Sequence, residues 1–241
     1  MTEAQNTLQD WISSSQNIVF FGGAGVSTES GIPDFRSVDG LYHQHYKYPP
    51  ETIISRSFFD RDPAEFYRFY QDRMLYLDAR PNPAHRKLAE LEAAGRLKAV
   101  VTQNIDGLHQ AAGSREVLEL HGSVLRNYCM DCHKSFDVRY VKDAPGIPTC
   151  DACGGTVKPD VVLYEEALDQ DVMYKAVDYI RKADMLIIGG TSLVVYPAAG
   201  LVNYYSGDKL VVVNKSPTPM DMQADLVVAG AIGEIFSQIK V

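Results

Sequence analysis

All four cysteines of this 241-residue chain lie between residues 129 and 153, in two Cys-x2-Cys pairs. The pairs Cys129/Cys132 and Cys150/Cys153 are 17 residues apart, a spacing typical of two-knuckle zinc sites. Four ordinary buried cysteines or two disulfides are the other interpretations, and disulfides fit a cytosolic chain poorly. Because four cysteine ligands leave zinc no open position for water, we expect the zinc to be structural and the chemistry to lie elsewhere.

A glycine-rich turn follows the first apolar run, in the sequence NIVFFGGAGVS over residues 17–27. Such a turn lets the backbone approach a pyrophosphate, whose charge the N-terminus of a following helix stabilises. Thr28 stands where the third glycine of G-x-G-x-x-G would be, so the motif alone leaves a plain tight turn equally open. The polar continuation TESGIPDFRS over 28–37 has no evident use in a hydride-transferring dehydrogenase.

Polar residues follow several later apolar runs, in the segments TQNID (102–106), HGS (121–123), GGTS (189–192) and NK (214–215). In open α/β sheets, ligands bind beyond the carboxyl ends of the strands. A lone histidine at a strand end is more often structural, although its charge changes near neutral pH. The convergence of His121 with Asn104 and Asp106 favours a functional site.

The elements that would position these residues are short, dense apolar runs separated by helical patterns. The runs are 18–21, 97–101, 117–120, 185–188, 210–213 and 226–228. Runs without polar alternation indicate strands buried on both faces. Helical spacing of apolar residues predicts helices over 83–95, with Gly95 as C-cap, and over 169–183. We therefore predict an α/β fold with a doubly wound, Rossmann-like parallel sheet.

Two segments interrupt the alternation of strands and helices and predict a second, smaller domain. The first is a helical insertion over 37–82, with an aromatic loop and a helix beginning near Pro63, and the second is the zinc-binding insertion over 125–158. The doubly wound domain would then comprise residues 1–36, 83–124 and 159–241.

Composition excludes several classes of protein. Hydrophobic residues make up 46% and charged residues 22% of the chain, as in globular proteins with a substantial core. The formal charge of −8 argues against direct nucleic-acid binding, which needs a basic face.

The uncharged stretch 185–207 is interrupted by Gly-Gly-Thr-Ser and by Pro197, so it predicts a strand, a turn and a helix rather than a membrane span. The N-terminus shows no signal peptide, and we expect a cytoplasmic monomer.

These motifs together resemble the sirtuin family of NAD-dependent protein lysine deacylases, in its short, bacterial-type form. The resemblance runs from about Trp11 to Ile239 and rests on GAGVSTESGIPDFRS (23–37), TQNIDGLHQ (102–110), HGS (121–123), the paired Cys-x2-Cys knuckles, GTSLVVYPA and VNK (213–215). It implies that NAD is consumed in the cleft between the two domains. It also implies a structural Zn²⁺ on the four cysteines.

The resemblance assigns roles to individual residues. His121 would be the general base on the ribose hydroxyls, and Asn104 would position the ribose and a water. Asp106 would accept hydrogen bonds from the nicotinamide carboxamide. The other implied cofactor contacts are Gly23, Ala24, Gly25 and Thr28 at the pyrophosphate; Thr191, Ser192, Asn214, Lys215 and Ile232 at the adenosine half; Phe35 and Ile105 at the nicotinamide; and Arg36 and Gln103 at phosphate and ribose.

The implied products are nicotinamide, the free lysine and O-acyl-ADP-ribose. Substrates would be acyl-lysine proteins or peptides that bind as an extended strand. The implied substrate contacts are Val161, Val162, Tyr164 and Val195. Members that remove succinyl groups carry a Tyr-x-x-Arg pair in the helical insertion; here Tyr70 follows Tyr67 where the arginine would stand, so we expect acetyl or neutral longer acyl groups to be preferred.

One departure from the family pattern is Glu165, which follows Tyr164 where a glycine is usual. Its carboxylate either favours basic peptides at the lip of the groove or faces solvent. Two other functions share these motifs: a mono-ADP-ribosyltransferase of the same fold, and a non-catalytic NAD-sensing or zinc-ribbon module. The presence of both Asn104 and His121 favours the deacylase.

Overall fold

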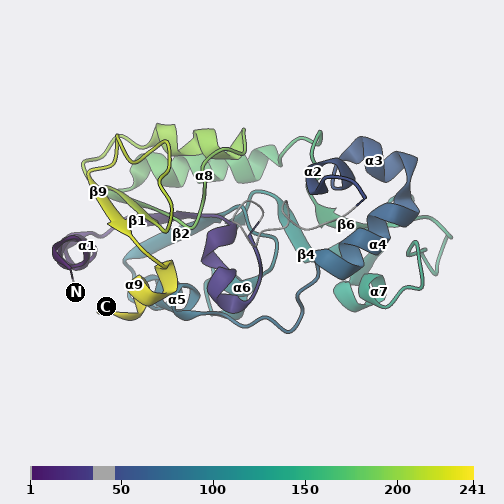
Figure 1. Ribbon diagram of the computed structural model, residues 1–241, viewed down its shortest axis with the longest axis horizontal. Helices are drawn as coiled ribbons and strands as arrows, with labels where there is room; N and C mark the ends of the chain where they lie inside the picture. The colour runs from purple at the N-terminus through teal and green to yellow at the C-terminus, as the bar shows by residue number, and fades with distance from the viewer. Residues whose placement is uncertain (1, 35–46) are drawn as a thin grey trace.

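A six-stranded parallel sheet forms the centre of the larger domain (Figure 1). The computed structural model describes residues 2–34 and 47–241. The strand order is β3-β2-β1-β7-β8-β9, and every pairing is parallel. The strands are β1 (Ile18–Gly22), β2 (Leu97–Thr102), β3 (Val117–Glu119), β7 (Met185–Gly189), β8 (Leu210–Asn214) and β9 (Leu226–Ala229). All six apolar runs are therefore strands, and the predicted doubly wound sheet is confirmed.

One face of the sheet is covered by three helices (Figure 1): α1 (Glu3–Ser14), α5 (Pro83–Ala93) and α9 (Ile232–Ser237). Leu8, Leu88 and Phe236 from these helices pack with alternate strand residues such as Phe20 and Ile187. Successive strand residues point to opposite faces, so this core takes alternate residues of β1, β7 and β8.

The opposite face is covered by α8 (Gln170–Lys182) and the 3-10 helix η4 (Ala198–Tyr204). Ile180 and Leu201 pack there with the intervening strand residues Phe21, Leu186 and Ile188. With an apolar core on each side, the strands need hydrophobic residues at nearly every position, which explains the absence of polar alternation in the sequence.

Local signals determine where the two predicted helices begin and end. The side chain of Asn82 caps α5 by accepting a hydrogen bond from the Ala84 amide, and Asp169 caps α8 by accepting one from Val172. Gly95 adopts a φ of +76° just after α5, as glycine does at helix C-termini. Both predicted helices are confirmed, and Gly95 lies just past the end of the first.

The smaller domain combines the two insertions (Figure 1). A three-stranded antiparallel sheet has the order β5-β4-β6, with β4 (Gly122–Cys129), β5 (Ser135–Asp137) and β6 (Val157–Val161). Helices α2 (Pro50–Ile53), α3 (Arg56–Arg61), α4 (Pro63–Arg73) and α7 (Val138–Lys142) pack with it. Phe58, Phe66 and Tyr67 share one buried core with Cys129 and Val157, so helical and zinc-binding insertions form a single unit.

One local expectation needs correction. The glycine-rich turn is followed by two 3-10 turns, η1 (Ala24–Val26) and η2 (Thr28–Ser30), and not by the longer helix expected after the first strand. The 185–207 stretch forms β7, a turn and the 3-10 helix η4, in the predicted order of strand, turn and helix. A further short helix, α6 (Leu108–Ala111), follows the Asn-Ile-Asp turn. Among the helices of residues 2–34 and 47–241, none is long and apolar enough to cross a bilayer.

Candidate active site

A cavity of about 1030 Å³ lies at the carboxyl ends of the parallel strands and extends to the smaller domain. Its wall includes nearly all the site residues predicted from the sequence that the structure describes. These are Ala24, Gly25, Thr28, Gln103, Asn104, Ile105, Asp106, His121, Thr191, Ser192, Asn214, Lys215 and Ile232, together with Val161, Val162, Tyr164 and Val195. Segments more than 200 residues apart in the chain thus meet around one cavity, as expected at strand ends of a doubly wound sheet.

Three predicted residues lie elsewhere or cannot be placed. Phe35 and Arg36 fall outside the described residues. Gly23 is buried and does not line the cavity: a Cβ atom there would lie 2.8 Å from Thr191 Cβ and 2.9 Å from Gln103 Oε1. Its place behind Thr191 and Gln103 requires glycine because no side chain fits.

His121 lies between the two domains, where β3 gives way to β4. Its Nδ1 atom is 2.9 Å from the carbonyl oxygen of Gln103. A carbonyl only accepts, so Nδ1 carries the proton and Nε2 remains as an acceptor. Burial lowers the pKa of His121 below its ordinary value, although the bond to Gln103 opposes this. At neutral pH the ring is therefore neutral and able to act as a base.

A hydrogen-bonded chain joins the turn after β2 to the glycine-rich turn after β1. Asn104 Nδ2 donates to Ser27 Oγ at 3.1 Å, and Ser27 Oγ donates to Asp106 Oδ2 at 2.6 Å. Burial raises the pKa of Asp106, while its bonds from Ser27 and the Leu108 amide oppose the shift. Sequence reasoning missed Ser27, although its place within the turn between Gly25 and Thr28 was the available signal.

The glycine-rich turn is held by close backbone contact with the end of β7. Gly25 N donates to Gly190 O at 2.7 Å. Gly190 has a φ of +58°, and a Cβ atom there would lie 2.3 Å from the Val26 nitrogen. Both the conformation and the contact require glycine at Gly190. This contact fixes the turn that presents Ala24 and Gly25 to the cavity.

A second polar group lies where β7 and β8 end. Thr191 Oγ1 donates to Gln103 Oε1 at 3.1 Å, and Asn214 Nδ2 donates to Thr191 O at 3.2 Å. Gln103 Nε2 is buried and has no hydrogen-bond partner among the described residues. A buried donor without a partner is costly, so this edge of the cavity suits a ligand that carries acceptors.

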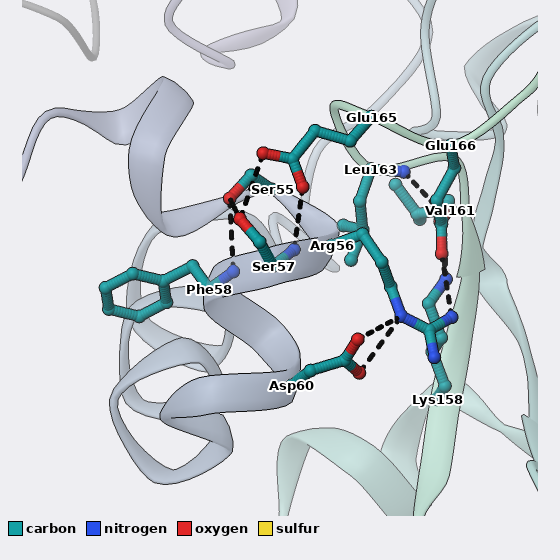
Figure 2. A network of polar contacts seen from close by, with 10 residues as sticks. All are labelled: Ser55, Arg56, Ser57, Phe58, Asp60, Lys158, Val161, Leu163, Glu165 and Glu166. Carbon is teal, nitrogen blue, oxygen red and sulfur yellow. Dashed lines mark hydrogen bonds and ion pairs between the residues drawn. The ribbon is translucent and has the colours of Figure 1, made fainter.

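The far wall of the cavity comes from the segment that follows β6. Val162 N donates to His121 O at 3.0 Å, which holds this segment beside the histidine. Glu165 lies at the same wall, but its carboxylate accepts hydrogen bonds from the amide and hydroxyl of Ser57 (Figure 2). Glu165 is exposed to solvent, as one of the two sequence-based expectations had it, and it also contacts the helical insertion, which neither expectation included.

The four cysteines form a cluster suited to a metal. Their Sγ atoms all lie within 4.8 Å of one another, with 3.4 Å between Cys129 and Cys153 and 3.6 Å between Cys132 and Cys150. Ligands about 2.3 Å from a tetrahedral zinc lie roughly 3.8 Å apart, so the donor set fits Zn²⁺. The backbone amides of Asp131 and Ala152 each donate to a cysteine sulfur at 3.4 Å. None of the cysteines lines the cavity.

Comparisons with known proteins identify the family. The sequence model of the Sir2 family matches residues 23–197. A protein from Clostridium perfringens named NAD-dependent protein deacetylase is 58% identical over 242 residues, covering 99% of each chain. One of the same name from Cutibacterium acnes is 50% identical, covering 97% of this chain and 96% of its own.

Solved structures agree. A structure of Sir2 with a p53 peptide and NAD⁺ superposes with a TM-score of 0.86 at 41% identity, covering 98% of this chain and 96% of its own. Another, of Sir2 with 2'-O-acetyl-ADP-ribose and a deacetylated p53 peptide, gives 0.85 at 40% identity, covering 96% and 95%. This chain belongs to the Sir2 family.

Proposed function

We propose that this chain is an NAD-dependent protein lysine deacetylase that consumes NAD and releases nicotinamide, O-acyl-ADP-ribose and the deacylated lysine. The observation that carries the proposal is the single cavity in which His121, Asn104 and Asp106 meet both the glycine-rich turn and the segment after β6. A base, a polar cofactor wall and an apolar groove next to each other are what acyl transfer from lysine to a nucleotide needs. The relatives' names support the same activity.

The residues around the cavity fit NAD. The unpartnered donor Gln103 Nε2 needs an acceptor, which a ribose hydroxyl or phosphate supplies. Ala24, Gly25 and Thr28 would face the pyrophosphate, and Thr191, Ser192, Asn214, Lys215 and Ile232 would hold the adenosine half. Asp106 would accept hydrogen bonds from the carboxamide beside Ile105. When bound, NAD supplies an electrophilic ribose carbon, with nicotinamide as the leaving group.

His121 would act as the general base. Its neutral ring holds Nε2 ready to accept a proton from a ribose hydroxyl, while the Nδ1–H bond to Gln103 fixes its orientation. The chain Asn104–Ser27–Asp106 would hold the ribose side of the site rigid. Apolar residues around the groove would exclude water until the acyl group has been captured.

The acyl-lysine would enter along the segment after β6. Val161, Val162, Tyr164 and Val195 line this part of the cavity and would contact the extended peptide and its acyl-lysine side chain. Residues of this one chain supply both the cofactor wall and the substrate wall of the cavity, so a monomer would suffice for the proposed activity. Its surroundings would be the cytoplasm, where NAD and acylated proteins are both present.

The experiment that tests this function incubates the purified protein with NAD and an acetyl-lysine peptide and follows the mass of the peptide. We expect the peptide to lose its acetyl group only when NAD is present. A peptide or protein that instead gains ADP-ribose would favour the mono-ADP-ribosyltransferase. Binding of NAD without any turnover would favour the non-catalytic module.

Acyl preference follows from the helical insertion. Tyr67 is buried and its hydroxyl donates to Val157 O at 2.6 Å, and neither Tyr67 nor Tyr70 lines the cavity. Tyr67 is thus engaged with the backbone and is not placed to hold an acyl carboxylate. We expect kcat/KM for an acetyl peptide to exceed that for the matched succinyl peptide by about tenfold or more, since Tyr70 stands where succinyl-removing members carry the arginine that pairs with the acyl carboxylate. Faster removal of succinyl would contradict this prediction.

A further inference from the structure

The residue after Tyr164 combines an unusual backbone with a specific contact. Glu165 has a φ of +77°, in the left-handed region that glycine adopts freely and that most other residues, asparagine apart, rarely adopt. A glutamate held there needs compensation from its surroundings. The compensation is visible at its carboxylate.

Both carboxylate oxygens of Glu165 contact one residue of the helical insertion (Figure 2). Oε2 accepts from the Ser57 amide at 2.8 Å, and Oε1 accepts from the Ser57 hydroxyl at 2.9 Å. Ser57 is the second residue of α3, so its N–H belongs to the first turn, where amides lack partners within the helix. A negative charge at that end of a helix is also electrostatically favourable.

The backbone on either side strengthens this link. Arg56 N donates to Tyr164 O at 2.9 Å, and Tyr164 N donates to Ile54 O at 3.0 Å, which forms a short parallel bridge between the insertion and the cavity wall. The next residue, Glu166, accepts from Arg56 and from the Leu163 amide. The link therefore lies within one network that also reaches Lys158 (Figure 2).

This network borders the part of the cavity that receives the substrate. Val162, Tyr164 and Glu165 all line the cavity, and the same segment is bonded to His121 through Val162. Movement of the segment 162–166 relative to α3 would change the shape of the cavity rim that this segment forms. It would leave the glycine-rich turn on the opposite wall unchanged.

We propose that Glu165 is a positioning residue for the acyl-lysine peptide. Its carboxylate forms a latch, the pair of hydrogen bonds that joins the start of α3 to the segment 162–166. The latch fixes the shape of the cavity rim formed by that segment, so that the rim can bind the peptide. The inference rests on the proposed function. It differs from direct recognition of basic peptides, because the role assigned here is carried by the two hydrogen bonds to Ser57 and needs no contact with the peptide.

Three substitutions separate these roles. Glu165→Gln keeps an acceptor for the Ser57 amide but removes the charge. Glu165→Ala removes the latch while keeping a side chain in the left-handed conformation, and Glu165→Gly removes it in a residue that adopts this conformation freely. Asp60→Asn is the matched control, because it weakens an exposed partner of Arg56 on the same helix and leaves Glu165 untouched.

The measurement is steady-state deacetylation of one acetyl peptide with basic flanking residues and one with neutral flanking residues, at saturating NAD. We expect Glu165→Ala and Glu165→Gly to raise the KM of both peptides alike by about three- to tenfold. Their kcat and KM for NAD should change by less than about twofold. Glu165→Gln and the control should stay near wild type.

Two results would overturn the inference. One is an unchanged peptide KM in both Glu165→Ala and Glu165→Gly. The other is a KM rise confined to the basic peptide and shared by Glu165→Gln, which would assign charge recognition to Glu165. If the wild type itself fails to deacetylate either peptide, the proposed function fails. Amide hydrogen exchange at Ser57 still tests the contact with Glu165 in that case. Unchanged exchange at Ser57 in Glu165→Gly would refute the contact.

Discussion

The cysteine cluster and the cavity at the sheet edge are both built from polar or reactive side chains, yet they are assembled in opposite ways. The cluster takes four like residues from 25 consecutive positions, packed within 4.8 Å of one another. The cavity takes single residues from the ends of strands spread between Ala24 and Ile232. The cluster closes on itself and suits a structural metal, whereas the cavity wall includes Gln103, whose Nε2 has no hydrogen-bond partner among the described residues. The metal-binding residues therefore come from one short segment, whereas the residues that line the cavity are brought together only by the whole fold.

Replacing His121 should give the largest loss of activity. A small loss would contradict the assignment of the chemistry to the cavity. We expect His121→Ala to lower kcat for deacetylation by about 100- to 10,000-fold, because the substitution removes the proposed general base. Melting temperature and zinc content should remain close to those of the wild type. His133→Asn, an exposed histidine within the cysteine loop, is the control and should retain activity. Substantial turnover by His121→Ala would remove its assigned role.

Replacing Cys150 should have the complementary effect on structure. Cys150 is buried in the core shared by the helical and zinc-binding insertions. We expect Cys150→Ser to lose bound zinc and to lower the melting temperature, because metal binding contributes directly to folding. Zinc content by mass spectrometry and thermal unfolding check this. Asp151→Asn, which only weakens an exposed ion pair with Lys134, should change neither.

Two buried histidines outside the cavity should make the stability of the protein depend on pH. His85 and His109 pack with ring centroids 4.7 Å apart, and burial lowers the pKa of His85 to about 4 and that of His109 well below its ordinary value. Between pH 6.5 and 4 the unfolded chain binds more protons at these sites, so stability falls as the pH falls. At pH 5, His85 alone accounts for about 2 kcal/mol.

His109→Leu tests this effect, because neither ring nitrogen of His109 has a partner among the described residues. We expect the melting temperature of the variant to fall less than that of the wild type between pH 7 and pH 5. Equal losses in both proteins would show that His109 does not titrate on unfolding.

The smallest effect concerns Ser27. Ser27→Ala removes the hydroxyl that joins Asn104 to Asp106 and leaves both in place. We expect kcat/KM to fall by about three- to thirtyfold, well short of the loss on removing His121. A loss as large as that of His121→Ala would mean that Ser27 itself takes part in the chemistry.

The sequence predicted most of the fold because its strands are dense apolar runs and its helices show apolar residues at helical spacing, with Gly95 marking the end of one of them. It predicted the cysteine cluster because spacing alone determines that site. It did not predict the 3-10 turns after β1, because Gly25 and Gly190 meet through a backbone contact that only the sheet brings about. Nor did it predict that Glu165 contacts Ser57, because more than 100 residues separate them.

The most direct test of the account measures the fate of NAD in a single reaction with an acetyl-lysine peptide. It predicts that nicotinamide, O-acetyl-ADP-ribose and deacetylated peptide appear in equal amounts, and that none appears without the acetyl group. Nicotinamide released with free acetate, or with ADP-ribose attached to protein, would contradict the assignment of this cavity to acyl transfer from lysine.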